Sequence, residues 1–248
     1  MGRILVATTT RYDDTHEIRA RLALRMVQAA RTLGIRVVTV DSSPNPRMKE
    51  CLAGNGAEVI RETEGATMGA GRRQALAYVK NLAAPDDAIV WMDPEKAPLI
   101  QFLEEICLPI LSSTADIVVP GRSEEGLASY PAVQAAYERC GNASFALLTR
   151  RALDVWFGPR AMNRAGVEEF LAYAGEYGDR WDSIFIPVVR ALKHGLRVGP
   201  CVVEYHHPAE QTAAESRDLR LGLLKRLDQL HSLVTALYKE AVALGFVA

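Results

Sequence analysis

The sequence predicts an α/β fold with a doubly wound, mostly parallel sheet and a C-terminal helical segment. Short continuous apolar runs, typical of strands buried on both faces, alternate along the first half of the chain with segments of helical periodicity. That alternation indicates a parallel sheet with right-handed crossovers. A chain of 248 residues, 49% of them hydrophobic, can also bury one sizeable core. Because ligands gather where such strands end, the loops after the apolar runs are the expected site.

The composition excludes several classes of partner. The formal net charge is −1, which gives no electrostatic case for nucleic acid or an anionic membrane. The four cysteines lie far apart without a C-x-x-C pair, which argues against a zinc cluster or redox motif and fits a reducing cytosol. No apolar stretch approaches the roughly 20 residues that span a bilayer, and the N-terminal run is too short for a signal peptide. We therefore expect a soluble, cytoplasmic protein.

Four strands and three helices are expected before residue 97. The strands are residues 4–8, 35–40, 57–61 and 86–92, and the helices are residues 14–33, 48–53 and 69–79. Asp14 and Glu17 have the spacing of a capping box, and Gly34 is placed to end the first helix. In a parallel sheet the loops that follow these four strands share one edge.

The second half is expected to mix helices, strands and polar loops. A helix over residues 97–111 contains Pro109, which would kink or end it, and another helix follows Pro131. Further helices are expected at residues 167–174 and 182–194, strands at 115–120, 143–148 and 196–205, and polar loops at 121–130 and 156–164.

Beyond residue 213, apolar residues recur at steps of three and four up to residue 244. This periodicity predicts one long amphipathic helix or two. The segment could fold over the domain or form a homodimer with a second subunit.

The strand at residues 86–92 ends in Asp93-Pro94-Glu95. Carboxylates two residues apart in extended chain point the same way, and the proline fixes the backbone between them. Hard oxygen ligands suit Mg²⁺ or Mn²⁺, which would take further oxygens from a diphosphate. Alternatively, Asp93 caps the next helix and Glu95 lies in its first turn.

Two further features are expected at the same edge. His206 and His207 end the last strand; we favour His207 as a metal ligand because it begins the exit loop, and an imidazole would bias the site toward Mn²⁺. Gly69-Ala70-Gly71 precedes two arginines at a helix start, where amides and guanidinium groups can hold phosphate, although the glycines could equally form a plain turn.

The order of these motifs resembles the GT-A fold glycosyltransferases of the family 2-like type, especially the mannosylglycerate and glucosyl-phosphoglycerate synthases. The motifs are Val40-Asp-Ser-Ser43 after the second strand, the glycine-rich helix, the Asp-x-Glu, and a histidine after the last strand. The resemblance covers residues 1–211 and implies a GT-A domain with a nucleotide-sugar-binding half (1–96) and an acceptor half (97–211), followed by a helical segment (212–248). It also implies a UDP- or GDP-sugar donor, a divalent ion, and a small acceptor that could be anionic.

The resemblance assigns roles to single residues. Thr8 and Thr10 would lie beside the base and ribose, and Asp41 with Ser43 beside the nucleoside. Gly69, Gly71 and Arg72 would lie at the diphosphate, Asp93 at the ribose or a metal-bound water, and Glu95 with His207 on the metal. Two departures matter: Ala70 stands where family members often have Lys, and Glu95 stands where they have Asp.

The segment from Gly178 to Asp182 resembles the one that carries the catalytic acid in these enzymes. Asp182 is our first candidate for the base and Asp179 the second, while Trp181 offers an apolar face to a sugar ring. Arg122, Arg160 and Arg164 are expected in loops at the same edge, where they could clamp an anionic acceptor. The alternative for the segment is a helix N-cap and a core tryptophan.

Two other functions stay open. A sugar nucleotidyltransferase shares the architecture, but its glycine-rich basic signature directly follows the first strand, where this chain has Thr8-Thr-Thr-Arg11. A non-catalytic protein that binds nucleotide sugars is the third hypothesis, suggested by Ala70 and Glu95.

Overall fold

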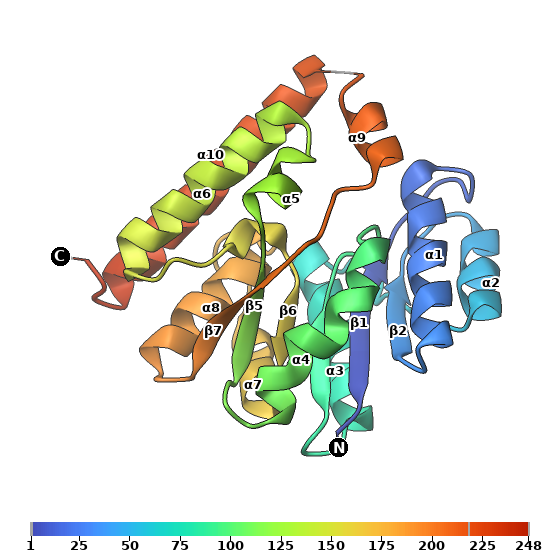
Figure 1. Cartoon of the computed structure of the whole chain (residues 1–248), viewed down its shortest axis with the longest axis horizontal. Helices are drawn as coiled ribbons and strands as arrows, with labels where there is room; N and C mark the ends of the chain where they lie inside the picture. Colours follow the sequence, from blue (N-terminus) through green and yellow to red (C-terminus); the bar gives the residue numbers. More distant parts are fainter. Residues whose placement is uncertain (1, 218, 248) are drawn as a thin grey trace.

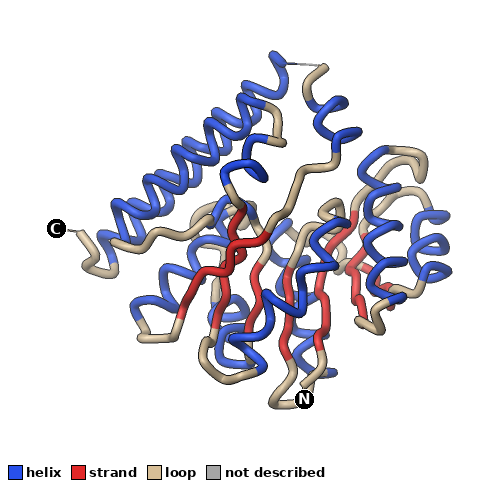
Figure 2. Tube along the Cα trace, viewed as in Figure 1, coloured by secondary structure: helices blue, strands red, loops and turns tan. Residues whose placement is uncertain are grey.

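A seven-stranded sheet in the order β3-β2-β1-β4-β6-β5-β7 forms the centre of the computed structural model, which describes residues 2–217 and 219–247 (Figures 1 and 2). All neighbouring strands are parallel except β6, which runs antiparallel to both β4 and β5. The strands are β1 (Ile4–Thr10), β2 (Arg36–Asp41), β3 (Glu58–Arg61), β4 (Ala88–Trp91), β5 (Ile117–Arg122), β6 (Arg160–Met162) and β7 (Val198–Val203). The predicted doubly wound, mostly parallel sheet is therefore confirmed.

Helices cover both faces of the sheet. They are α1 (Ile18–Thr32), α2 (Pro46–Asn55), α3 (Met68–Leu82), η1 (Ala97–Phe102), α4 (Leu103–Leu111), α5 (Glu124–Ala128), α6 (Ala132–Thr149), η2 (Val155–Phe157), α7 (Arg164–Ala172), α8 (Asp182–Lys193), α9 (Ala209–Glu215) and α10 (Leu219–Ala243). One buried cluster joins the sheet to α3, α7 and α8, and the other joins it to α1, α2 and α4. Alternate residues of β1 go to the two clusters, because successive strand side chains point to opposite faces.

Helices α6 and α10 lie side by side and extend beyond the carboxyl edge of the sheet (Figure 1). Leu233 and Leu237 of α10 are buried in the cluster that also holds Phe145 of α6. The C-terminal segment thus folds back onto its own domain. Leu224 and Leu227 of α10 are exposed, and the association with a second subunit stays a prediction.

The predicted strand at residues 143–148 is wrong, because these residues lie inside helix α6. The apolar run there mixes two helix faces: Phe145 is fully buried, whereas Leu147 is 80% exposed. Periodicity over six residues could not separate a buried helix from a strand.

The two segments predicted as loops also contain helix or strand residues. The segment 156–164 contains β6, whose three residues are too few to show an alternating pattern. The segment 121–130 contains the end of β5 and the short helix α5, which Ser123 caps by accepting from the amide of Gly126.

Two helix ends differ from expectation. Half of the predicted capping box forms, in a turn before α1 begins: the Glu17 carboxylate accepts from the amide of Asp14 at 2.9 Å and also from that of Asp13. The Asp14 carboxylate accepts from the amide of His16 and not from that of Glu17. The C-terminal segment forms two helices: the recurring apolar residues lie in α10, and α9 spans the expected domain boundary at residue 211.

In the part of the chain that the structure describes, no helix is both long enough and apolar enough to cross a membrane.

Candidate functional site

A cavity of about 470 Å³ opens beyond the carboxyl end of β4 and is lined in part by residues of α6 and α10. These two helices form an arm that extends past the sheet (Figure 1). The walls of the cavity come from the β4 exit loop, α6, the segment after β7, and α10. The charged and imidazole side chains that line it are Arg19, Arg72, Asp93, Glu95, Lys96, Glu138, His207, Glu215, Lys225 and Arg226. A second hollow, of about 460 Å³, lies where β2 and β3 end and is lined by Asp41, Ser43, Lys49 and Glu62 among others.

Asp93 follows the end of β4 and faces the larger cavity. Its Oδ2 accepts a hydrogen bond from Lys96 Nζ at 2.8 Å. Burial alone would raise the pKa of Asp93, but the ammonium of Lys96, with help from Arg72 and Arg19, outweighs burial and lowers it. Gly158 makes room for this carboxylate: a Cβ there would lie 2.8 Å from Asp93 Oδ2, and its φ of +102° also favours glycine.

Glu95 is turned toward α1. Its Oε1 accepts from the Tyr12 hydroxyl at 3.0 Å and pairs with Arg19 Nη2 at 2.5 Å. The residue is only 8% exposed, and both contacts hold its carboxylate away from the position of a metal ligand beside Asp93. Burial, reinforced by the nearby Glu95, raises the pKa of Tyr12, which therefore stays a neutral hydrogen-bond donor.

His207 is a buried, neutral imidazole. Burial, with the nearby charges of Lys96, Arg226 and Arg122, lowers its pKa to about 3. The Thr212 hydroxyl donates its proton to the carbonyl of Ser129 at 3.0 Å, so at 2.7 Å from His207 Nδ1 it acts as the acceptor. Nδ1 then carries the ring proton, and Nε2 keeps a lone pair for a ligand in the cavity.

The donors around the cavity fit a divalent ion only in part. Among the described residues, no group of three or more His, Cys, Asp and Glu side chains could hold a metal as they stand. The expected trio of Asp93, Glu95 and His207 is therefore not preassembled, because Glu95 is taken by Arg19 and Tyr12. One carboxylate and one imidazole remain, which is a donor set that suits Mn²⁺ when diphosphate oxygens complete the coordination.

Arg72 reaches the cavity from α3. Its Nη1 donates to the carbonyl of Arg180 at 2.6 Å and to Ser183 Oγ at 2.8 Å, while its buried Nε has no partner among the described residues. The guanidinium lies 5.5 Å from the ring of Trp91. Burial lowers the pKa of Arg72 to about 10, which leaves it charged near neutral pH.

The glycine-rich start of α3 is covered by the chain itself. The amide of Gly69 donates to the Asp179 carbonyl at 2.8 Å, and Thr67 Oγ1 accepts from the amide of Ala70. A Cβ on Gly69 would lie 2.0 Å from Asp179 Oδ1, and one on Gly71 would lie 2.5 Å from Glu62 Oε1. Both glycines therefore permit close packing, and the helix start is not open to a phosphate in this structure.

Asp179 and Asp182, the predicted catalytic carboxylates, are held by local partners and do not line the cavity. Asp179 accepts two hydrogen bonds from Arg73, at 2.6 and 2.9 Å. Asp182 accepts from the amides of Asp179 and Arg180, at 3.0 and 2.7 Å, and from the Tyr173 hydroxyl. Their catalytic role stays a prediction. Trp181, between them in sequence, does line the cavity.

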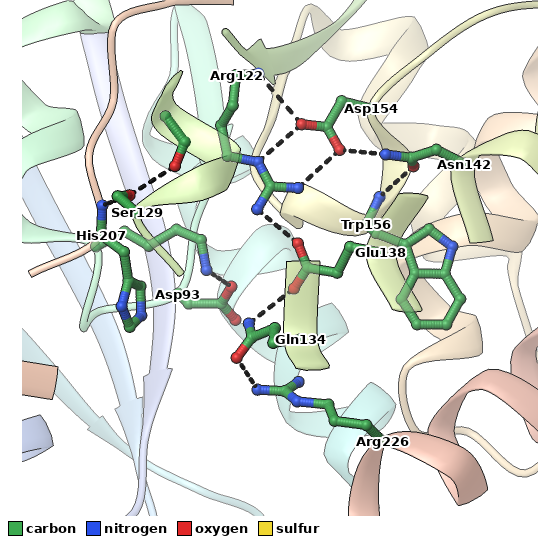
Figure 3. A network of polar contacts seen from close by, with 12 residues as sticks. Asp93, Arg122, Ser129, Gln134, Glu138, Asn142, Asp154, Trp156, His207 and Arg226 are labelled. Carbon is green, nitrogen blue, oxygen red and sulfur yellow. Dashed lines mark hydrogen bonds and ion pairs between the residues drawn. The ribbon is translucent and has the colours of Figure 1, made fainter. Parts of the chain in front are cut away.

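Arg122, a predicted acceptor ligand, is committed to an internal network (Figure 3). Its side chain is fully buried, forms a two-bond pair with Asp154 at 2.8 and 2.9 Å, and pairs with Glu138 at 2.5 Å. Glu138 in turn accepts from Gln134 at 2.7 Å. Gln134 accepts from Arg226 of α10 at 2.6 Å, so the network connects β5 and α6 to α10.

The other two predicted clamp arginines also have internal partners. Arg160 is fully buried and donates to the carbonyls of Pro159 and Val155 at 2.6 and 2.8 Å. Arg164 was expected at the cavity edge, but it lies at the opposite edge, bound to the carbonyls of Lys80 and Ala83. The reason is β6: an antiparallel strand carries the chain from one edge to the other between these arginines.

The predicted nucleoside residues meet where β1 and β2 end. Thr10 pairs with Asp41 in register, and its hydroxyl donates to Asp41 Oδ1 at 2.7 Å, as does that of Ser43 at 2.6 Å. Asp41 and Ser43 line the smaller hollow. Thr8 is fully buried, and its hydroxyl donates to the carbonyl of Met92 at 2.8 Å, so it joins β1 to the end of β4.

Sequence reasoning missed several residues of the larger cavity. Lys96 follows the acidic motif directly, so its position was a usable signal. Arg19 of α1 and Arg226 of α10 come from distant elements, and only the tertiary fold brings them to this cavity.

The fold has known relatives among solved structures, although no protein-family model and no curated protein matches the chain. Glucosyl-3-phosphoglycerate synthase from Mycobacterium tuberculosis with Mn²⁺, UDP-glucose and phosphoglyceric acid is similar at TM-score 0.58 and 15% identity, over 91% of this chain and 79% of that chain. The same enzyme with Mn²⁺, UDP and phosphoglyceric acid gives 0.57 and 14%, over 91% and 78%. With Mn²⁺, UDP-glucose and glycerol 3-phosphate it gives 0.55 and 15%, over 91% and 80%. The chain therefore has the fold of the GT-A glycosyltransferases.

Proposed function

We propose that the protein is a glycosyltransferase that moves a sugar from a UDP- or GDP-linked donor to a small acceptor. The observation that carries the proposal is the cavity at the carboxyl end of β4, which Asp93, His207 and Arg72 line together, while Asp41 lines a second hollow at the ends of β2 and β3. In a GT-A fold an anionic donor would lie across the strand ends, with its nucleoside in the smaller hollow and its diphosphate in the larger one.

The residues divide the work by their chemistry. Thr10 and Ser43 fix the orientation of the Asp41 carboxylate toward the nucleoside. Asp93 and His207 would hold Mn²⁺ or Mg²⁺, which supplies positive charge to the leaving diphosphate when bound. Arg72, charged and buried, adds a fixed cation on the same side.

The acceptor would lie between the metal edge and the α6–α10 arm. Trp156 and Trp181 line the cavity, as do Lys225 and Arg226 of α10. Aromatic rings suit the apolar face of a sugar, and the cations suit an anionic group. The complexes of the structural neighbours make UDP-glucose the first donor to test and phosphoglyceric acid and glycerol 3-phosphate the first acceptors.

The test incubates the protein with UDP- and GDP-sugars and these acceptors, with Mn²⁺ or Mg²⁺, and measures the released nucleoside diphosphate and the product mass. We expect transfer or slow donor hydrolysis that falls about 100-fold or more in Asp93→Ala, because a transition-state charge contact is worth that much. Asp86→Ala, on an exposed carboxylate just before β4, is the matched control. Full activity in Asp93→Ala, or no reaction with any donor, contradicts the proposal.

The same mixtures distinguish the runner-up function. A sugar nucleotidyltransferase would instead release pyrophosphate from a nucleoside triphosphate and a sugar phosphate.

A further inference from the structure

Lys96 sits on the carboxylate that the proposed ion needs. Its Nζ lies 2.8 Å from Asp93 Oδ2, and the two residues are three apart on the same turn. The Lys96 side chain is only 17% exposed and that of Asp93 32%, so the pair is partly withdrawn from solvent. The contact is therefore stronger than an ordinary surface ion pair.

The ammonium of Lys96 is also held from other directions. It lies 5.6 Å from the centroid of the Phe157 ring, a cation–π contact. The positive charge of Lys96 helps to lower the pKa of His207, and Tyr205 helps to raise the pKa of Lys96. Both residues line the same cavity. The position that Lys96 fills is thus next to both donors available to a divalent ion.

A divalent ion that approaches this site alone meets three obstacles. One oxygen of Asp93 is occupied, a like charge stands beside it, and Glu95 is engaged by Arg19 and Tyr12. Ion binding without other ligands should therefore be weak.

A nucleoside diphosphate removes the first two obstacles and supplies oxygens in place of Glu95. Its phosphate oxygens can coordinate the ion, and they can also accept the Lys96 ammonium through a charge-assisted hydrogen bond. We infer that Lys96 is an internal competitor of the divalent ion for Asp93, released to the diphosphate when ion and nucleotide bind together. The inference rests on the proposed function, since it assumes that the ion and the diphosphate meet in this cavity.

By thermodynamic linkage, nucleotide and ion then strengthen each other's binding by the same factor. In the free protein the ammonium of Lys96 neutralises Asp93. When ion and nucleotide are bound, the same ammonium contacts the diphosphate, which is the leaving group. Lys96 is in this sense a residue that makes ion binding conditional on the donor.

The test is a titration of the full chain with Mn²⁺ followed by electron paramagnetic resonance, with and without UDP or GDP. Lys96→Met keeps the unbranched shape and most of the length of the side chain and removes its charge. We expect it to bind Mn²⁺ about tenfold or more tightly than the wild type without nucleotide, because a like charge is lost at close range. The factor by which nucleotide strengthens Mn²⁺ binding should fall in parallel.

Two variants serve as controls. Lys80→Met removes a lysine with a similar exposure of 20% that is paired with Glu168 at 2.6 Å, and it should leave Mn²⁺ binding unchanged. Lys96→Arg keeps the charge and should keep the weak binding of the wild type, which also shows that the position tolerates replacement. Thermal melting of each variant checks that the fold is intact.

The outcomes separate this inference from the proposed function. If Mn²⁺ and nucleotide bind together in the wild type but Lys96→Met binds Mn²⁺ no more tightly without nucleotide, the competition is wrong and the function stands. If no variant binds Mn²⁺ with any nucleotide, both the inference and the proposed ion site are overturned.

Discussion

The acidic pair Asp93 and Glu95 and the single carboxylate of Asp182 were all predicted as site residues, but they have different surroundings in the fold. Asp93 and Glu95 pair with long basic side chains, Lys96 and Arg19, at the wall of a cavity. Asp182, in contrast, binds two backbone amides and a buried tyrosine hydroxyl, away from that cavity. A ligand can replace the contact between a carboxylate and a flexible cationic side chain, because that side chain can move to the ligand. It cannot replace a contact with backbone amides in the same way, because the amides cannot move.

The same difference holds for the ends of β4 and α3. In the cavity beyond the end of β4, His207 keeps an unshared ring nitrogen, because only its Nδ1 is bonded to Thr212. The start of α3 has its amides taken by Thr67 and Asp179. A ligand finds an open ring nitrogen at the first place and a closed surface at the second.

The largest effect that this comparison predicts is on folding, at Asp182. Asp182→Ala leaves the amides of Asp179 and Arg180 and the Tyr173 hydroxyl without their acceptor in a buried place, so we expect the free energy of unfolding to fall by about 3 kcal/mol. Asp93→Ala should lower it by less, because the partner of Asp93 is the flexible Lys96 side chain, which can turn into the cavity, whereas a backbone amide cannot move. Urea denaturation measures both; equal losses would remove the distinction between the two sites.

The next effect concerns ion binding and compares two adjacent histidines. His207→Ala removes the proposed nitrogen ligand, so the affinity for Mn²⁺ in the presence of nucleotide should fall about 100-fold. His206 is exposed, and His206→Ala should bind Mn²⁺ as the wild type does. Calorimetric titration provides the numbers, and a larger loss from His206→Ala would reverse the assignment.

The smallest effect is the pH dependence of stability through Asp179. Hydrogen bonds from Arg73, assisted by Thr67 and opposed by burial, lower the pKa of Asp179 below its value in the unfolded chain. Its contribution is therefore present above the ordinary aspartate pKa, near 3.9, and is lost as the pH falls through the lower folded value. Because the pair partly reaches solvent, we expect less than about 1 kcal/mol.

Asp179→Asn should consequently lose less stability than the wild type between pH 5 and pH 3, as followed by thermal melting. If the melting temperatures of the two proteins changed with pH at the same rate, Asp179 would make no pH-dependent contribution to stability.

Much of the fold was predictable because its signals are local. Continuous apolar runs marked β1, β2 and β4, and helical spacing marked α1 and α3. The second half was harder: β6 has three residues, and the apolar run at 143–148 belongs to a helix with one exposed and one buried apolar face. Missing β6 also misplaced Arg164, because an unrecognised antiparallel strand reverses the edge at which the chain emerges.

A site residue was predictable from the sequence only where its chemical type and its position at the end of a strand were enough to identify it. Asp93, His207 and Asp41 line the hollows at the edge where parallel strands end. The sequence could not show that Arg122 would be neutralised by Asp154 and Glu138, since those partners lie 32 and 16 positions away and depend on the folding of α6. Contacts between distant elements decide whether a charged residue is free for a ligand.

The most direct test of the account is a crystal of the protein soaked with Mn²⁺ and UDP or GDP, measured at the manganese absorption edge. The account predicts one anomalous peak in the β4 cavity, coordinated by Asp93, His207 Nε2 and diphosphate oxygens, with Lys96 moved from Asp93 to a phosphate. A peak at Asp179 and Asp182 instead, or nucleotide bound in the cavity with Lys96 still on Asp93 and no metal beside it, would contradict it.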